Sequence, residues 1–101
     1  MLQKRYSADK QSCAVIFTID HGLACGAKRI SLVGDFNQWD LAATPMKRRK
    51  DGSFAATLEL ECGRSYQFRY CIDHTSWEND AGADAYVPSP FADSTNSVVT
   101  V

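Results

Sequence analysis

The strictest pattern in the sequence is a period-two alternation over residues 64–72. Apolar and aromatic side chains occupy every second position, at Tyr66, Phe68, Tyr70 and Ile72. Successive side chains of a strand point to opposite faces of a sheet, so one face can enter a core while the other faces away from it. The pattern predicts a half-buried β-strand, with Gln67 and Arg69 on its outer face.

Four other short segments are rich in β-forming residues and are separated by turn signals. They cover residues 13–19, 28–33, 54–60 and 97–101. Asp51-Gly52 is a strong turn signal, and no segment offers ten or more residues with a helical period. Strands at about 8–12-residue spacing indicate an all-β sandwich. We expect residues 40–50 and 79–97, which contain proline and many polar residues, to be loops.

The chain has 101 residues, of which 45% are hydrophobic, which fits one globular domain. Residues 1–12 are polar and basic without periodicity and predict an N-terminal tail that is flexible or packed at an edge. The start has no apolar segment of the kind found in secretory signals, and no apolar run approaches a membrane span. Four cysteines without CxxC spacing indicate reduced thiols used as small apolar residues. These features predict a cytoplasmic protein.

Charge excludes some classes of partner. Eleven Lys plus Arg against twelve Asp plus Glu give a formal net charge of −1, so we expect neither a nucleic acid nor a membrane as partner. The local basic run at residues 47–50 has two interpretations. It is a solvated loop that keeps a sheet edge from pairing, or it docks a partner.

Two tryptophans are the candidate functional residues. Trp39 ends the segment Gly34-Asp35-Phe36-Asn37-Gln38-Trp39, a turn that follows a predicted strand, and Trp77 lies just beyond another turn. Each indole could cover the core or form a platform for a flat ligand. Arg69 could donate hydrogen bonds to such a ligand, or could pair with Glu59 across strands.

Several motifs together resemble a known family. They are VGDFNQW at residues 33–39, Pro45-Met46, DGSF at 51–54, YQFRY at 66–70 and NSVV at 96–99. This series resembles the isoamylase-type early set domain, the immunoglobulin-like β-sandwich of carbohydrate-binding module family 48. Relatives include N-terminal domains of branching enzymes, isoamylases and pullulanases, and the glycogen-binding domain of the AMP-activated protein kinase beta subunit. The likeness implies one domain over residues 13–101 and looks closest to small bacterial proteins consisting of this domain alone.

The resemblance also implies a function and a set of site residues. In the glycogen-binding relatives two tryptophans stack on glucose rings of an α-1,4-glucan, and these fall on Trp39 and Trp77. A basic residue that bonds sugar hydroxyls falls on Arg69, and two polar residues before the last strand fall on Ser94 and Asn96. A leucine that wedges into the curved glucan in the kinase subunit would fall near Ala92, which is too small to do the same.

The sequence therefore predicts a non-catalytic module that binds α-glucan, glycogen or maltooligosaccharide. The alternative is a protein-interaction module that docks a glycogen-metabolising enzyme, with sugar binding weak or lost. We expect no enzymatic activity, cofactor or metal, because no catalytic triad or metal-ligand spacing is present. The acidic residues Asp73, Glu78, Asp80 and Asp84 are predicted to lie in solvated loops rather than to bind calcium.

Overall fold

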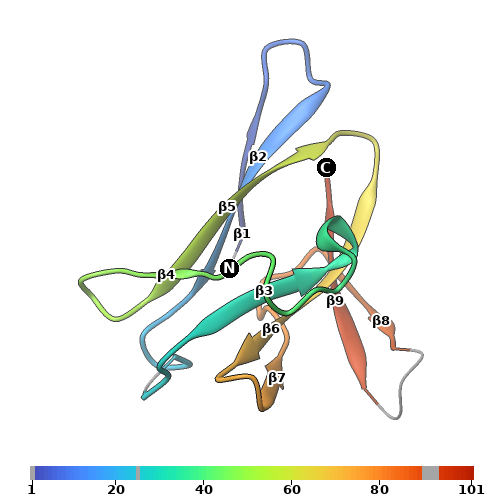
Figure 1. The fold of residues 1–101 in the computed structure, drawn as a ribbon. Helices are drawn as coiled ribbons and strands as arrows, with labels where there is room; N and C mark the ends of the chain where they lie inside the picture. The colour runs from blue at the N-terminus through green and yellow to red at the C-terminus, as the bar shows by residue number, and fades with distance from the viewer. Residues whose placement is uncertain (1, 25, 90–93) are drawn as a thin grey trace.

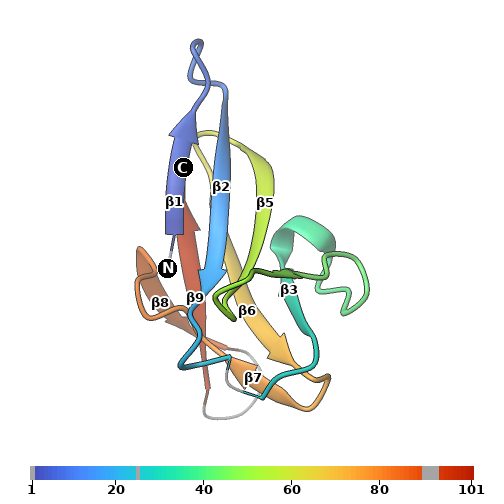
Figure 2. The ribbon, with the colours of Figure 1, turned by 90° about the vertical axis from the view of Figure 1, so that its left-hand side faces the viewer.

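The computed structural model describes residues 2–24, 26–89 and 94–101. The chain forms two antiparallel sheets that pack face to face (Figures 1 and 2). In one sheet the order is β1 (Leu2–Tyr6), β2 (Ser12–Ile19), β5 (Phe54–Glu61) and β4 (Lys47–Arg48). In the other it is β3 (Ile30–Gly34), β6 (Ser65–Ile72), β9 (Thr95–Thr100) and β8 (Ala85–Pro88), and β7 (Ser76–Glu78) also pairs with β6. The predicted all-β, immunoglobulin-like sandwich is confirmed.

The core lies between the sheets, where the alternating strands predicted from the sequence face each other. Phe17 of β2 and Phe68 of β6 are fully buried, with ring centroids 5.1 Å apart in an edge-on arrangement. Phe36 comes from the short 3-10 helix η1 (Asp35–Asn37), and its ring centroid lies 5.7 Å from that of Phe17. The aromatic cluster thus attaches η1 to the core, directly after β3.

Strand β6 has a different neighbour along each half of one edge. Its first half pairs with β9, as far as Phe68 opposite Ser97, and its second half pairs with β7, where Cys71 lies opposite Trp77. Its other edge pairs with β3 throughout Phe68–Ile72. Arg69 therefore lies where β6 changes partner from β9 to β7.

Predictions about the tail and two loops need correction. Leu2–Tyr6 form strand β1 along β2, which is the edge-packed alternative and not a flexible tail, and β4 and β8 lie within the segments expected to be loops. All three are edge strands, and of their side chains only that of Leu2 packs against the core, so their apolar pattern is weak. Lys4 contributes an ion pair instead, with its Nζ 2.7 Å from Asp84 Oδ2.

One of the acidic residues expected in solvated loops, Asp80, is buried. Asp80 is 1% exposed and accepts a hydrogen bond of 2.6 Å from the Tyr70 hydroxyl, while its backbone N–H donates to Ser97 Oγ at 2.9 Å. Burial, followed by this hydrogen bond, raises the pKa of the Tyr70 phenol far above its ordinary value. The prediction for Asp80 was wrong, because a buried tyrosine hydroxyl needs an acceptor.

The described cysteines are free thiols. They are Cys13, Cys62 and Cys71, of which Cys13 and Cys71 are buried. Cys25 and Ala92 lie outside the described residues. Within the ranges that the structure describes, no helix is long and apolar enough to cross a membrane.

Gly34, the last residue of β3, is expected to tolerate no side chain. Its backbone is extended, but a Cβ atom there would lie 2.5 Å from the Gln67 carbonyl oxygen and 2.8 Å from Phe68 Cβ. We predict that Gly34→Ala lowers the free energy of unfolding by about 1–3 kcal/mol, because a packed backbone must shift. Unfolding in urea, monitored by circular dichroism, measures this loss of stability.

Gly22→Ala is the matched control, because its Cβ would meet only Asp20 Oδ1 at 3.4 Å. We expect this control to change the free energy of unfolding by less than about 0.5 kcal/mol. Equal stability of the two variants would contradict the close approach of β3 and β6 at Gly34.

Candidate functional site

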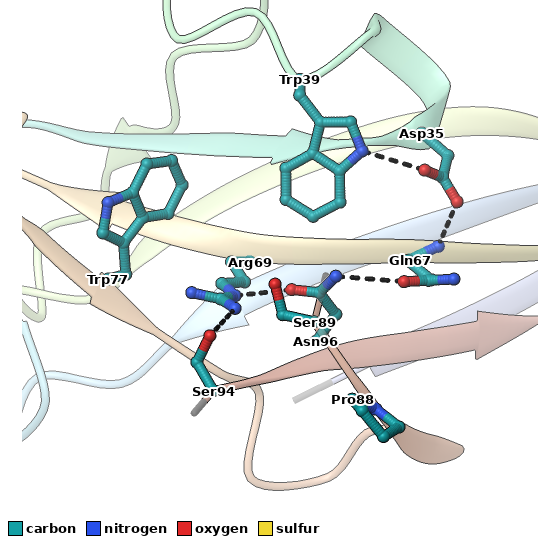
Figure 3. Close-up of a pocket in the computed structure, with 9 residues that line it drawn as sticks. All are labelled: Asp35, Trp39, Gln67, Arg69, Trp77, Pro88, Ser89, Ser94 and Asn96. Atoms are coloured by element: carbon teal, nitrogen blue, oxygen red, sulfur yellow. Dashed lines mark hydrogen bonds between the residues drawn. The ribbon is translucent and has the colours of Figure 1, made fainter. Parts of the chain in front are cut away.

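The outer face of the β3–β6–β9 sheet carries an open groove with a volume of about 860 Å³. All five residues predicted from the sequence line it, and Figure 3 shows them around one hollow. Four further residues complete the lining. The full set is Asp35, Trp39, Gln67, Arg69, Trp77, Pro88, Ser89, Ser94 and Asn96.

The backbone at Trp39 is in an unusual conformation. Gln38 and Trp39 have φ angles of 54° and 57°, in the left-handed region that non-glycine residues rarely adopt. Such a residue costs roughly 1–3 kcal/mol and persists only where its surroundings hold it. Here the Trp39 N–H donates to the Gly34 carbonyl at 2.9 Å. This bond closes the turn that carries Trp39 back over the end of β3.

The Asn37 side chain fastens the same turn from inside. Its Oδ1 accepts the Gly34 N–H at 3.1 Å, and its Nδ2 donates to the Leu32 carbonyl at 2.9 Å and to Thr44 Oγ1 at 3.1 Å. Asn37 is therefore a turn-forming residue. The turn that positions Trp39 is bonded both to β3 and to the loop that follows.

The Trp39 indole is oriented by a carboxylate. Its Nε1–H donates to Asp35 Oδ1 at 2.9 Å, and Asp35 Oδ2 accepts the backbone N–H of Gln67 at 2.8 Å. Trp39 is half-buried but belongs neither to the core nor to the residues packed against it. The interpretation of Trp39 as a cover for the core is therefore wrong.

Trp77 reaches the groove from β7. The preceding turn contains Asp73 and His74 in the left-handed region, with φ angles of 51° and 59°. Asp73 Oδ1 accepts the backbone N–H groups of Arg29 and Lys28 at 2.9 and 2.8 Å, and these bonds hold the pKa of its carboxyl below the usual range. Trp77 is 45% exposed and lies outside the core as well.

A row of polar side chains lies below the two indoles in the view of Figure 3. Arg69 Nε donates to Asn96 Oδ1 at 2.6 Å, and Arg69 Nη2 donates to Ser94 Oγ at 2.7 Å. Asn96 Nδ2 in turn donates to Gln67 Oε1 at 3.0 Å. These bonds fix the guanidinium plane and the amide planes relative to one another.

Arg69 does not pair with Glu59. Glu59 lies on β5 of the opposite sheet, where it accepts a hydrogen bond of 2.9 Å from Ser12 Oγ. Because Phe68 and Tyr70 enter the core, Arg69 points to the other face of β6. The cross-strand pair considered from the sequence is therefore wrong.

The basic run begins as part of the sheet. Lys47 and Arg48 form β4 and pair with Ala55 and Phe54 of β5. These two residues therefore belong to the sheet and not to a solvated loop beside its edge. The Arg48 guanidinium lies 5.2 Å from the centroid of the Phe54 ring and donates to the Ala27 carbonyl. Arg48 therefore stabilises the fold locally.

The chemistry of the groove suits an uncharged polyhydroxy ligand with apolar faces. Two indoles offer flat apolar surfaces, and the row beside them offers oriented donors and acceptors. Among the described residues no group of three or more His, Cys, Asp or Glu side chains could hold a metal ion. Asp35, Gln67, Pro88 and Ser89 were missed as lining residues. The alternation places Gln67 on the face of Arg69, which is a signal that could have identified it.

Two comparisons relate the chain to known proteins. A stretch of 56 residues is 41% identical to the 1,4-alpha-glucan branching enzyme GlgB of Aquifex aeolicus (strain VF5). The aligned stretch covers 54% of this chain but only 9% of that enzyme. Residues 23–92, well over half of the chain, match carbohydrate-binding module 48 (isoamylase N-terminal domain). The chain therefore belongs to carbohydrate-binding module family 48.

Proposed function

We propose that the chain binds α-glucan, such as glycogen or maltooligosaccharide, non-covalently in the groove and without catalysing a reaction. One observation carries the proposal, namely that two indoles and a hydrogen-bonded polar row line the same open groove. A glucose ring has apolar C–H faces surrounded by hydroxyls, so it needs both kinds of surface. Trp39 and Trp77 stack on glucose rings, and Arg69, Asn96 and Ser94 bond their hydroxyls.

The hydrogen bonds within the row support this role. A guanidinium has five N–H donors, and Arg69 directs its Nε and Nη2 groups to Asn96 and Ser94. The donors that remain serve sugar hydroxyls, in a plane that the protein has already fixed. A site whose side chains are ordered before binding loses less conformational entropy when the ligand arrives.

The relative supports the choice of glucan. The enzyme from Aquifex aeolicus is named for 1,4-alpha-glucan, which makes this polymer the first ligand class to test. The groove is open, so affinity is expected to be modest, because a shallow site buries little of the ligand and the sugar hydroxyls must give up water.

The tryptophans provide the first test. We predict that Trp39→Ala and Trp77→Ala each weaken binding of maltoheptaose at least about tenfold, which corresponds to about 1.4 kcal/mol. The physical reason is the loss of an apolar surface that a glucose ring covers. Tryptophan fluorescence titration measures wild-type binding, and isothermal titration calorimetry measures the variants.

Two controls accompany this experiment. Cellohexaose tests selectivity for the α-linkage, and Tyr6→Ala removes an aromatic side chain that is 49% exposed but does not line the groove. We expect Tyr6→Ala to bind maltoheptaose as the wild type does. Full binding by folded Trp39→Ala and Trp77→Ala proteins would refute the two-tryptophan site.

Arg69 provides the second test. We predict that Arg69→Met weakens maltoheptaose binding about tenfold, because a hydrogen-bond donor to the ligand is lost and Asn96 and Ser94 lose their common partner. The affinity of Arg69→Lys should lie between those of the wild type and Arg69→Met, since an ammonium donates hydrogen bonds but cannot reproduce the planar fork of a guanidinium. Isothermal titration calorimetry gives the affinities.

Arg64→Met is the matched control for Arg69→Met. Arg64 is exposed near the start of β6, outside the groove, and its Nε lies 3.7 Å from Glu61 Oε2. This variant is expected to keep wild-type affinity. Equal affinities of Arg69→Met and Arg64→Met would exclude Arg69 as a ligand-binding residue.

A further inference from the structure

Asp35 occupies a special place among the groove residues, because each of its carboxylate oxygens accepts a hydrogen bond from a different part of the site. Oδ1 accepts from the Trp39 indole at 2.9 Å, and Oδ2 accepts from the Gln67 backbone N–H at 2.8 Å. Asp35 itself is exposed, and its main chain opens η1. An exposed carboxylate thus joins the Trp39 indole to strand β6.

The carboxylate is rigidly placed on both sides. Gly34, the preceding residue, is buried against Gln67 and Phe68, and the following residue, Phe36, packs in the aromatic cluster. The Asp35 backbone therefore has little freedom to shift. The Trp39 indole, which bonds Oδ1, is therefore fixed relative to β6, whose Gln67 N–H bonds Oδ2.

The second bond links the aromatic and polar parts of the groove. The Gln67 backbone is held by Asp35, while Gln67 Oε1 accepts from Asn96. The connection then continues to Arg69 and Ser94 through the bonds described above. Figure 3 shows this series running from the Trp39 indole across the floor of the groove.

We propose that Asp35 is a positioning residue, which sets the orientation of the Trp39 indole and so raises the affinity of the groove for its ligand. The effect on affinity rests on the proposed glucan binding, whereas the effect on Trp39 does not. Without the carboxylate, the indole is free to rotate about its side-chain torsions. Ligand binding must then order it, at a cost in conformational entropy.

The first experiment reports on Trp39 without any ligand. The chain has two tryptophans, so Trp77→Phe leaves Trp39 as the single indole emitter. In this background we predict that Asp35→Ala lowers the fluorescence anisotropy of Trp39 and increases its quenching by acrylamide. Asp40→Ala is the matched control, since the Asp40 carboxylate accepts the Ala42 N–H and does not line the groove.

The second experiment measures affinity with both tryptophans present. We predict that Asp35→Ala weakens maltoheptaose binding by about two- to tenfold, because the Trp39 side chain is no longer ordered before binding. Asp40→Ala should bind as the wild type does. Asp35→Asn is the conservative variant. Its amide oxygen can accept from the indole, but its NH₂ group then faces the Gln67 N–H, so we expect intermediate anisotropy and intermediate affinity.

The possible outcomes separate the two proposals. Unchanged Trp39 anisotropy and quenching in folded Asp35→Ala protein overturn the positioning role. A weaker affinity without any change in the Trp39 signals also overturns it, because Asp35 then acts on the sugar directly. Altered Trp39 signals in a protein that binds no maltoheptaose, wild type included, support positioning and refute the proposed function. If circular dichroism shows that Asp35→Ala does not fold, the Trp39 anisotropy and quenching of Asp35→Asn decide whether Asp35 positions the indole.

Discussion

Strand β6 has one face in the core and the other at the groove, and this division fixes the arrangement of the site. Phe68 and Tyr70 lie on the inner face and are buried in the core, while Gln67 and Arg69 lie on the outer face and line the groove. A shift of one residue in the pairing of β6 would exchange these two sets. The buried aromatic residues therefore determine the position of the groove residues, since only one register buries them.

Both tryptophans depend on turns that the protein holds in a rare backbone conformation. In one turn the left-handed residues are Gln38 and Trp39 itself, and in the other they are Asp73 and His74, which precede Trp77. In each turn a short polar side chain accepts backbone N–H groups. Asn37 accepts that of Gly34, and Asp73 accepts those of Lys28 and Arg29 in the connection between β2 and β3. The aromatic surfaces are thus positioned before any ligand is present, which lowers the entropic cost of binding.

The strands with strong alternation or apolar content were predictable, whereas the edge strands β1, β4 and β8 were not. Strand β6 buries Phe68 and Tyr70 on one face, so its period-two pattern is visible. Strand β1 is held by main-chain pairing with β2 and by the Lys4–Asp84 ion pair. These interactions do not depend on a regular apolar pattern. Asp80 was misjudged for a related reason, because its partner Tyr70 is ten residues away along the chain.

The amino-acid sequence was enough to predict the sandwich, the outer position of Gln67 and Arg69, and the candidate pair of tryptophans, because period-two patterning and turn residues are local properties. The folded structure was needed to show that Asp35 bonds both the Trp39 indole and β6, and that Arg69 bonds Asn96 instead of Glu59. Such partners are set by the pairing of distant strands. β6 pairs with β9 and then with β7, and its pairing with β9 brings together side chains up to 29 residues apart in the chain.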